Sequence, residues 1–431
     1  MKALKPFYVL CLMTFLILSG AANAEVSPGD VIDKSNWQSV EGHVPESVLN
    51  WVKNGDIVMN IGKLNYRPYE YAKAIVEDTF ESNKGKYAIA DDVIVDAATG
   101  KEPEFILGWP FPEIDPEDPE AGIKFIYNRQ YLVLGYGNVS IPSLDFVFVD
   151  GEDGLVRKAD MAYYQNPMDG WEKARNIPNP DSLLRYQMFK FQAPYDISGT
   201  ALMTWRYLGD KRDVVFAYVP SIRRVRRLTP SNRSDAIIGS DACYDDAWGF
   251  DGKISDFEWK LIGNQEGFLP YLSEDVQPLI KPKPGVYQND PSTKDIVYGY
   301  QKDGWTGAQW APTNIIWVKR PMYILEGVSK DPYYNFGTTY LWMDAETGMA
   351  LVKVIHDRSG EYWKTCLISG ADFECKEDGK KMAIYSLQEF IDDRNNRATY
   401  VTAMGSKTPY IFGDEMDLNN YSLAGFAKFC K

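Results

Sequence analysis

Apolar and polar residues alternate along much of the chain with a period of two, which is typical of half-buried β-strands. Clear runs of this kind are 144–148, 201–208, 214–218 and 352–354. They end at segments that begin with Asp and finish with Gly, such as Asp150–Gly154 and Asp344–Gly348. Such segments provide the turn-initiating side chain and the positive-φ residue of a short hairpin. The stretch Met322–Ile368 therefore predicts three or four consecutive antiparallel strands.

Helical spacing is rarer than strand spacing. It predicts helices over Pro45–Lys53, about Pro68–Phe80, and Ser182–Lys190. The proline-rich segments 108–119 and 277–291 predict irregular structure, because proline lacks the amide hydrogen of regular elements. The pattern predicts a mainly β (α+β) fold: a large curved antiparallel sheet, or half-barrel, with a few lid helices around an apolar cavity.

Aromatic residues make up 14% of the chain and many of them occupy strand positions. The candidates for lining an apolar cavity on strands are Trp205, Tyr207, Phe216, Tyr218, Tyr340 and Trp342. Trp109 and Phe111 are also candidates, because the prolines beside them favour an extended, rigid segment that suits a lid tip or an interaction loop. The alternative for all of them is ordinary core packing.

Charge and composition narrow the function. The chain has 431 residues, a formal net charge of -14 and two histidines, His43 and His356. The acidity argues against nucleic-acid binding, which needs a concentrated basic surface. Two histidines cannot build a His-rich metal centre, and no nucleophile elbow, phosphate loop or zinc-protease motif occurs. We expect a non-enzymatic protein without a cofactor or a bound metal.

The N-terminus predicts export. Lys2 and Lys5 precede the apolar run Phe7–Leu18, and an Ala-Asn-Ala sequence ends at Ala24. This is the pattern of a signal peptide over residues 1–24, cleaved after Ala24. Twelve apolar residues are too few to span a bilayer core of about 30 Å. We expect a periplasmic protein whose residues 25–431 form a single domain with insertions.

Four cysteines remain after that cleavage. An even number in an oxidising compartment predicts two disulfides, although four cysteines allow three pairings. Cys366 and Cys375 flank a Gly-containing turn, as the arms of a hairpin would, so we favour Cys366–Cys375 and Cys243–Cys430. A metal site is the weaker alternative, since no CxxC spacing occurs.

Four arginines form the sharpest local charge feature: Arg223, Arg224, Arg226 and Arg227. Guanidinium groups can recognise an anionic head group or an acidic partner through bidentate contacts. The simpler reading, which we favour, is local ion pairing with the acids that follow, which are Asp235, Asp241, Asp245 and Asp246. Calcium binding by these acids is a weaker alternative, because they lack the regular spacing of an EF-hand loop.

Two motifs resemble a known family. One is Tyr207–Asp210 followed by Val215–Arg227 and Gly239–Asp241; the other is Gly108–Pro116, continued by Ala121–Lys124. Together they resemble exported bacterial proteins of unknown function labelled outer-membrane lipoprotein-sorting proteins, which are similar in fold to LolA/LolB-type lipoprotein carriers. The resemblance covers nearly all of the chain beyond the signal peptide, from about residue 29 to 357 and beyond. Because this chain is more than twice the length of a simple carrier, the cavity and lid of that carrier do not map onto it residue by residue.

The resemblance implies a function and partners. It implies a curved half-barrel with lid helices and a cavity for a lipid or lipoprotein acyl chain. It also implies service to an inner-membrane transporter of the resistance–nodulation–division (RND) superfamily and to an outer-membrane protein. The alternative is a periplasmic interaction module that docks on an envelope transport complex without carrying lipid.

Overall fold

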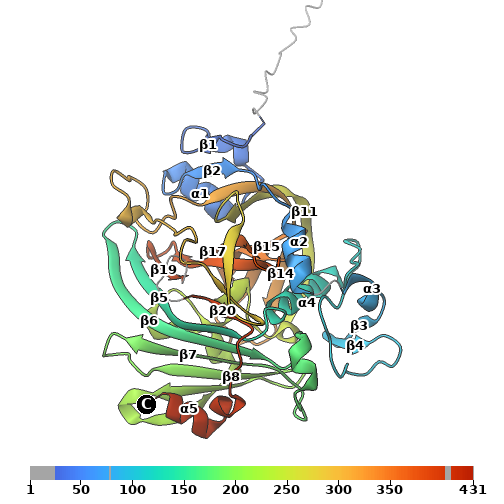
Figure 1. The fold of residues 1–431 in the computed structure, drawn as a ribbon. Helices are drawn as coiled ribbons and strands as arrows, with labels where there is room; N and C mark the ends of the chain where they lie inside the picture. Colours follow the sequence, from blue (N-terminus) through green and yellow to red (C-terminus); the bar gives the residue numbers. More distant parts are fainter. Residues whose placement is uncertain (1–24, 77–78, 403–408, 431) are drawn as a thin grey trace, which may run out of the picture.

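The computed structural model describes residues 25–76, 79–402 and 409–430. The predicted signal peptide lies outside the described residues. Eighteen strands form one large mixed sheet that curls into a partial ring, and a separate two-stranded hairpin projects from it (Figure 1). The mainly β, curved-sheet prediction is confirmed.

The sheet contains two antiparallel series that join side by side. The first series is β5 (Val139–Asp150), β6 (Gly154–Pro167), β7 (Leu183–Ala193), β8 (Ala201–Tyr207), β9 (Val214–Val219) and β10 (Arg224–Leu228). The second is β11 (Phe257–Tyr271), β14 (Ile316–Ser329), β15 (Phe336–Asp344), β16 (Ala350–Asp357), β17 (Tyr362–Cys375), β18 (Lys381–Asp392) and β19 (Arg397–Thr402). β19 pairs with β5, with Thr399 opposite Phe148, so the ladder continues from β10 round to β11.

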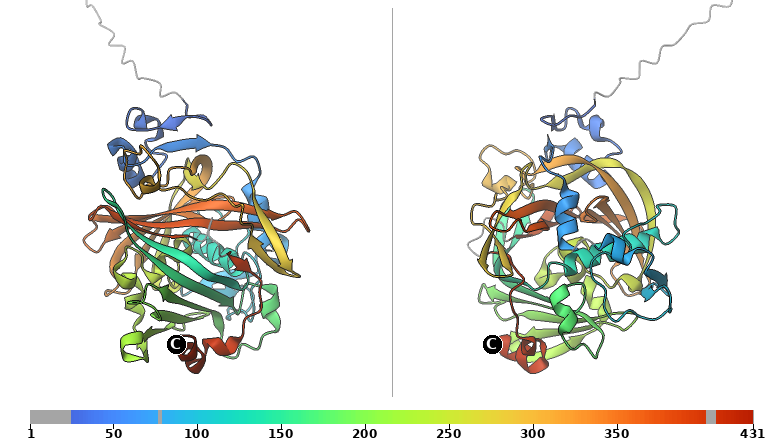
Figure 2. Two further views of the ribbon diagram at one scale, coloured as in Figure 1. Left: turned by 60° about the vertical axis from the view of Figure 1, so that its left-hand side comes forward. Right: turned by 45° about the vertical axis from the view of Figure 1, so that its right-hand side comes forward.

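Shorter strands and five helices complete the fold. The strands are β1 (Val31–Ile32), β2 (Met59–Gly62), β3 (Tyr87–Ala90), β4 (Val93–Asp96), β12 (Gln277–Lys283), β13 (Val286–Asn289) and β20 (Ile411–Phe412). The helices are α1 (Glu46–Asn54), α2 (Pro68–Ile75), α3 (Phe80–Asn83), α4 (Ala121–Leu134) and α5 (Leu423–Phe429). α2 and α4 lie on one side of the ring, and α5 lies at the far end from β1 (Figure 2).

The turn chemistry expected from the sequence is present. The Asp344 carboxylate accepts hydrogen bonds from the amides of Glu346 and Thr347, and Gly348 takes a φ of +72°. The Asp150 carboxylate likewise accepts from the amides of the next turn, which ends at Gly154. These turns fix the hairpins β15–β16 and β5–β6. The predicted antiparallel run over Met322–Ile368 is confirmed as β14 to β17.

Some local predictions are wrong. Residues 183–190 of the predicted helix 182–190 belong to strand β7, because both faces of β7 are buried and the two apolar faces together mimic helical spacing. Residues 277–291 contain β12 and β13, short strands in which prolines are tolerated. The segment 108–119 is irregular as predicted, and the first helix is confirmed by α1. The predicted helix over Pro68–Phe80 is confirmed for its first part by α2, whereas α4 was not predicted.

Candidate functional site

An apolar cavity of about 70 Å³ lies inside the curved sheet. Its outer wall is the face of β5, β6, β7, β18 and β19 that points into the ring. Its cover is the irregular segment 237–248, which crosses that face. The sheet contributes Ile141, Leu144, Phe146, Met161, Tyr163, Gln187, Phe189, Gln388, Phe390 and Val401, the cover contributes Ile237, Ala242, Cys243, Tyr244, Ala247 and Trp248, and Tyr410 completes the lining. Strand alternation places the sheet residues on one face.

Four polar or hydrogen-bonding side chains of the cavity, Tyr163, Gln187, Tyr244 and Trp248, bond to one another, and the Gln388 side-chain carbonyl accepts a hydrogen bond from the Trp248 backbone amide. The indole of Trp248 donates to the Tyr163 hydroxyl over 3.0 Å, and the Gln187 amide donates to the same oxygen over 2.6 Å. The Tyr244 hydroxyl donates to the Gln187 carbonyl over 2.8 Å. Burial raises the pKa of Tyr163 to about 12, so this phenol stays protonated. The hydrogen-bonding capacity at this end of the cavity is therefore used within the protein.

Charged side chains are absent among the residues that line this cavity. The remaining wall is aliphatic and aromatic. Such a surface gains free energy by contact with an apolar group, at about 25 cal/mol per Å² removed from water. A catalytic step needs a charged, nucleophilic or metal-bound group, and the cavity's one thiol, Cys243, is buried with its pKa raised well above the ordinary value by desolvation. The arrangement suits the binding of an apolar group.

Buried ion pairs hold the cover in place. Asp251, which follows the cover, pairs with Arg185 of β7, and both side chains are 1% exposed. Arg233, which precedes the cover, bridges Asp213 and Asp245. Neighbouring arginines hold the pKa of Asp213 at about 2 in spite of its burial. These charges lie outside the apolar cavity and tie both ends of the cover to the sheet.

A second set of ion pairs holds the middle of the cover. The Asp246 carboxylate contacts Lys353 of β16 at 2.6 Å and Lys364 of β17 at 2.9 Å. Asp241 contacts Arg397 of β19 at 2.6 Å. The two lysines keep the pKa of Asp246 well below its usual range. The cover is thus attached to β7, β16, β17 and β19 by charge.

These pairs correct the expectation for the arginine run. Asp241, Asp245 and Asp246 are buried and pair with distant basic residues, and Asp235 bonds to Asn232 and Asn335. The four arginines at 223–227 lie on the β9–β10 hairpin, all exposed, without an ion pair to a described acid. The favoured local pairing is therefore wrong. Asp241, Asp245 and Asp246 are too deeply buried to reach an exposed hairpin, and the exposed Asp235 bonds to asparagines instead.

Backbone strain accompanies the cover. Ile238 and Trp248 take φ values of +47° and +55°, in the left-handed region that disfavours residues with a side chain. Such conformations cost about 1–3 kcal/mol each and cluster at ligand clamps and switch regions. Ile237, Ile238 and Ala247 are half-exposed, so this part of the cover faces solvent next to the cavity.

The aromatic residues predicted from strand alternation lie elsewhere. Trp205, Phe216 and Tyr218 face away from the cavity and form a small core with the C-terminal residues, where the Trp205 indole donates to the Tyr421 carbonyl over 2.9 Å. Tyr207 belongs to a neighbouring cluster. Tyr340 and Trp342 are half-buried on β15 and do not line the cavity. Their role in ligand binding stays a prediction.

Trp109 and Phe111 line a different cavity, of about 320 Å³. Aromatic side chains from four other elements surround it: Tyr69, Phe80, Phe125 and Tyr323. Gly108 takes a φ of +66°, and the Trp109 amide donates to the Thr79 hydroxyl, which fixes the start of the segment. The structure thus brings these two residues together but separates them from the other predicted aromatics.

The cysteine pairing is not found. All four cysteines are buried and free. Cys366 and Cys375 lie on the same strand, β17, instead of on two hairpin arms. Nine residues of strand span roughly 30 Å, far beyond the Cα separation of about 4.4–6.8 Å that a disulfide requires. Cys243 lines the cavity, whereas Cys430 packs in the C-terminal core.

Sequence reasoning missed the residues that shape the cavity, namely Tyr163, Gln187, Tyr244 and Trp248. The first two lie on strands whose other face is also buried, and the last two lie in a segment without periodicity. The available signal was the concentration of Cys, Tyr and Trp within 243–248, next to acids that were read as a charge cluster.

Two further features are absent from the described part of the chain. No group of three or more His, Cys, Asp or Glu within it is arranged to hold a metal ion. None of its helices has the length and apolar character needed to cross a membrane.

Comparison with known proteins places the chain in a family. It is similar to a domain from Vibrio parahaemolyticus described as an outer membrane lipoprotein-sorting protein, with 14% identity and a TM-score of 0.48 over 72% of this chain and 100% of that one. A DUF1329 family protein from Desulfovibrio piger gives 14% identity and 0.46 over 72% and 98%, and a LolA superfamily protein from Nitrosomonas europaea gives 10% and 0.37 over 67% and 90%. No curated protein matches the chain. The model of DUF1329, a family of proteins of unknown function, matches residues 31–424, and the chain belongs to that family.

Proposed function

We propose that this protein is a non-catalytic periplasmic carrier that shields an acyl chain of a lipid or lipoprotein in the cavity inside its curved sheet. The observation that carries the proposal is the closed hydrogen-bond group of Tyr163, Gln187, Tyr244 and Trp248. Since these polar groups bond to one another, and the rest of the wall is aliphatic and aromatic apart from Cys243 and the Gln388 amide, the contacts that the wall offers a ligand are mainly apolar. Burial of a chain contributes about 0.8 kcal/mol per methylene group and needs no covalent step.

Loading of a long chain requires movement of the cover. The cavity of about 70 Å³ is small beside the ~300–1,000 Å³ of pockets for drug-sized ligands. The strained residues Ile238 and Trp248 lie in the cover, so their displacement would release strain while the buried ion pairs keep the ends of the cover attached. A chain would enter beside Ala247, which is half-exposed at the cavity.

The envelope setting is part of the proposal. The sequence of residues 1–24 supports export, and the family resemblance supports an RND-type inner-membrane transporter and an outer-membrane protein as partners. Such a carrier would accept its chain from one membrane and release it at the other.

Native mass spectrometry of protein purified from the periplasm tests the proposal, together with lipid extraction. We expect a bound species with the mass of an acyl-chain lipid, and displacement of a fluorescent fatty acid by that extract. Ala247→Trp should fill the entrance and abolish both signals. Ala236→Trp is the matched control, because Ala236 is exposed and precedes the cover without lining the cavity. Absence of lipid, with no difference between the two variants, would contradict the carrier function.

An interaction module that docks on a transport complex without lipid is the second candidate. The small cavity and the packing of the outer face by the C-terminal residues favour it. The same experiment separates the two functions, because a docking module purifies without lipid and tolerates both tryptophan substitutions.

A further inference from the structure

Positive charge is concentrated on the β9–β10 hairpin. Arg223, Arg224, Arg226 and Arg227 are all exposed, and none makes an ion pair with an acid among the described residues. The chain has 60 acidic and 46 basic residues, so the molecule as a whole is acidic. The hairpin therefore gathers four exposed arginines, without an ion pair to a described carboxylate, within five positions of an acidic chain.

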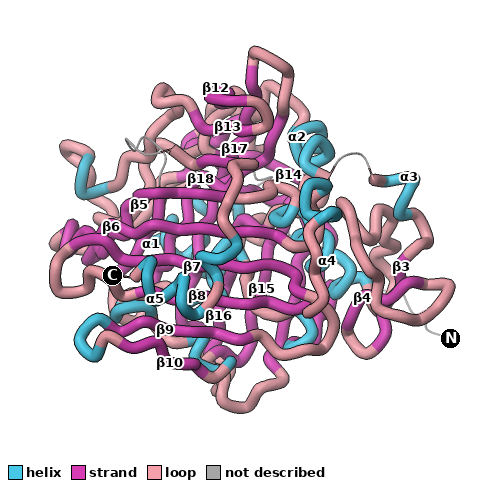
Figure 3. Tube along the Cα trace, turned by 60° about the horizontal axis from the view of Figure 1, so that its bottom comes forward, coloured by secondary structure: helices cyan, strands magenta, loops and turns pink. Residues whose placement is uncertain are grey.

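The hairpin presents this charge along an edge. β10 pairs with β9 and with no other described strand, so it lies at the margin of the sheet (Figure 3). Alternation directs Arg224 and Arg226 to one face and Arg227, with Val225, to the other. Arg223 occupies the turn itself, with a φ of +49°. An object that meets all four guanidinium groups must approach the strand edge-on.

Exposed apolar side chains lie at the same end of the sheet. Tyr195, in the turn between β7 and β8, is 98% exposed, and Ile222, in the turn between β9 and β10, is 40% exposed. Ala201 at the start of β8 pairs with Tyr218 near the end of β9, so the two turns are neighbours. Leu423 of α5, which lies at this end of the molecule, is 46% exposed (Figure 1).

We infer that this end of the molecule docks on a lipid bilayer that carries anionic head groups. Arginine binds phosphate through two parallel hydrogen bonds, which suits the four unpaired guanidinium groups. Protruding tyrosine and aliphatic side chains beside basic residues are typical of proteins that lie on a membrane surface. The side chains stand at turns and along an outer edge, which fits a flat surface. The inference is independent of what the interior cavity binds.

Sedimentation with vesicles tests the inference. The protein, in its exported form, is mixed with vesicles of phosphatidylglycerol and phosphatidylethanolamine, or with vesicles of phosphatidylcholine alone. We expect binding to the anionic vesicles, weakened by salt, and little binding to the zwitterionic ones. Each basic residue near an anionic surface contributes about five-fold in affinity. Replacement of Arg223, Arg224, Arg226 and Arg227 by Gln should therefore reduce binding by about 100-fold or more.

A charge-matched variant controls for net charge. Lys63, Lys101, Lys302 and Lys376 are exposed lysines elsewhere on the surface, and their replacement by Gln changes the net charge by the same amount. This variant should bind vesicles like the parent protein. Equal losses in the two variants would overturn the inference, because they would show a non-specific charge effect.

A dye placed at the turn tests the apolar contact. The four native cysteines beyond the signal peptide are buried, so Tyr195→Cys creates the accessible thiol for an environment-sensitive dye. We expect a blue shift on anionic vesicles that is absent for Ile262→Cys, an exposed position on β11. No shift at position 195 would overturn the insertion of this turn. Failure to bind either kind of vesicle would overturn membrane docking and indicate an acidic protein as the partner of the arginines.

Discussion

Lys353 of β16 and Asp246 of the cavity cover form an ion pair of 2.6 Å, with exposed fractions of 1% and 0% for the two side chains. Lys364 of β17 contacts the same carboxylate at 2.9 Å, so one acid holds two buried ammonium groups. The pairs join the cover to strands more than 100 residues away in the sequence. The position of the cover over the cavity therefore depends on a charge cluster inside the fold.

Removal of the shared acid should be costly. Asp246→Asn leaves Lys353 and Lys364 buried without a counter-charge, and breaking a buried pair costs about 3–5 kcal/mol. Urea unfolding at neutral pH measures the loss in the free energy of unfolding. Asp196→Asn is the control, because its pair with Arg157 is exposed and contributes at most about 1 kcal/mol. Similar losses in the two variants would show that the cluster does not stabilise the fold.

The same acid predicts a pH dependence. The pKa of Asp246 is lowered by the two lysines, so its stabilising contribution is complete above the unfolded pKa and is lost as the pH falls through the lower, folded pKa. The stability difference between the parent protein and Asp246→Asn should therefore narrow in strong acid. A difference that stays constant from neutral pH into the acid range would contradict the lowered pKa.

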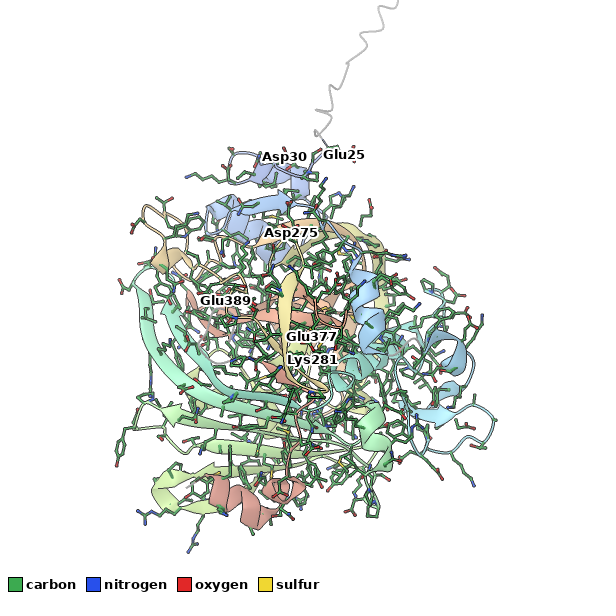
Figure 4. The ribbon with its side chains drawn as sticks, in the orientation of Figure 1. Glu25, Asp30, Asp275, Lys281, Glu377 and Glu389 are labelled. Carbon is green, nitrogen blue, oxygen red and sulfur yellow. The ribbon has the colours of Figure 1, made fainter. Side chains whose placement is uncertain are left out.

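Glu389 of β18 should destabilise the protein at neutral pH. Its side chain is fully buried within the molecule, and neither carboxyl oxygen has a hydrogen-bond partner (Figure 4). Desolvation raises its pKa well above the usual 4.5. The folded state thus holds a proton that the unfolded state loses, and stability falls as the pH rises above about 4.5.

Replacement of this glutamate by an apolar residue tests that effect. Glu389→Leu should stabilise the protein by about 1–3 kcal/mol at pH 8, since it removes an unsatisfied buried carboxyl group. The gain should shrink toward about pH 3, below the unfolded pKa of 4.5, where the glutamate is protonated in both states. Thermal unfolding of both proteins at the two pH values measures it. A gain that is larger in acid would contradict the sign.

How much the sequence could predict depends on whether a feature is local. The Asp344–Gly348 turn was predictable, because the residues that make its hydrogen bonds lie within the turn. The sequence favours ion pairs between the Arg223–Arg227 run and nearby acids. In the structure, Asp245 instead binds Arg233, and Asp246 binds lysines that the fold brings close to it. The cavity combines β5–β7 and β18–β19 with an aperiodic cover, so no single periodic pattern contains it.

The free cysteines lead to a chemical prediction. A thiol reagent should label no cysteine in the native exported protein, because Cys243, Cys366, Cys375 and Cys430 are buried. After unfolding, the same reagent should label all four of these cysteines. A reducing agent should leave the unfolding midpoint unchanged, since no bond constrains the unfolded chain. Mass spectrometry of the intact, unreduced protein provides the control, and a mass lower by two hydrogens per bond would show that disulfides exist.

Replacement of Gly122 in α4 by alanine should lower the free energy of unfolding, although this substitution usually raises it in a helix. Gly-to-Ala changes inside helices commonly stabilise by about 0.5–1 kcal/mol, because alanine restricts the unfolded chain and favours the helix. At Gly122 an added Cβ would lie 2.7 Å from the backbone carbon of Lys260 and 2.9 Å from the amide nitrogen of Leu261, both on β11. Backbone atoms of a strand that is hydrogen-bonded to β14 cannot yield as the tip of a side chain can, so Gly122→Ala should push α4 away from β11. We expect a loss of about 1–3 kcal/mol in urea unfolding, the usual cost of overpacking. A stabilised variant would show that α4 does not pack on β11 at this distance.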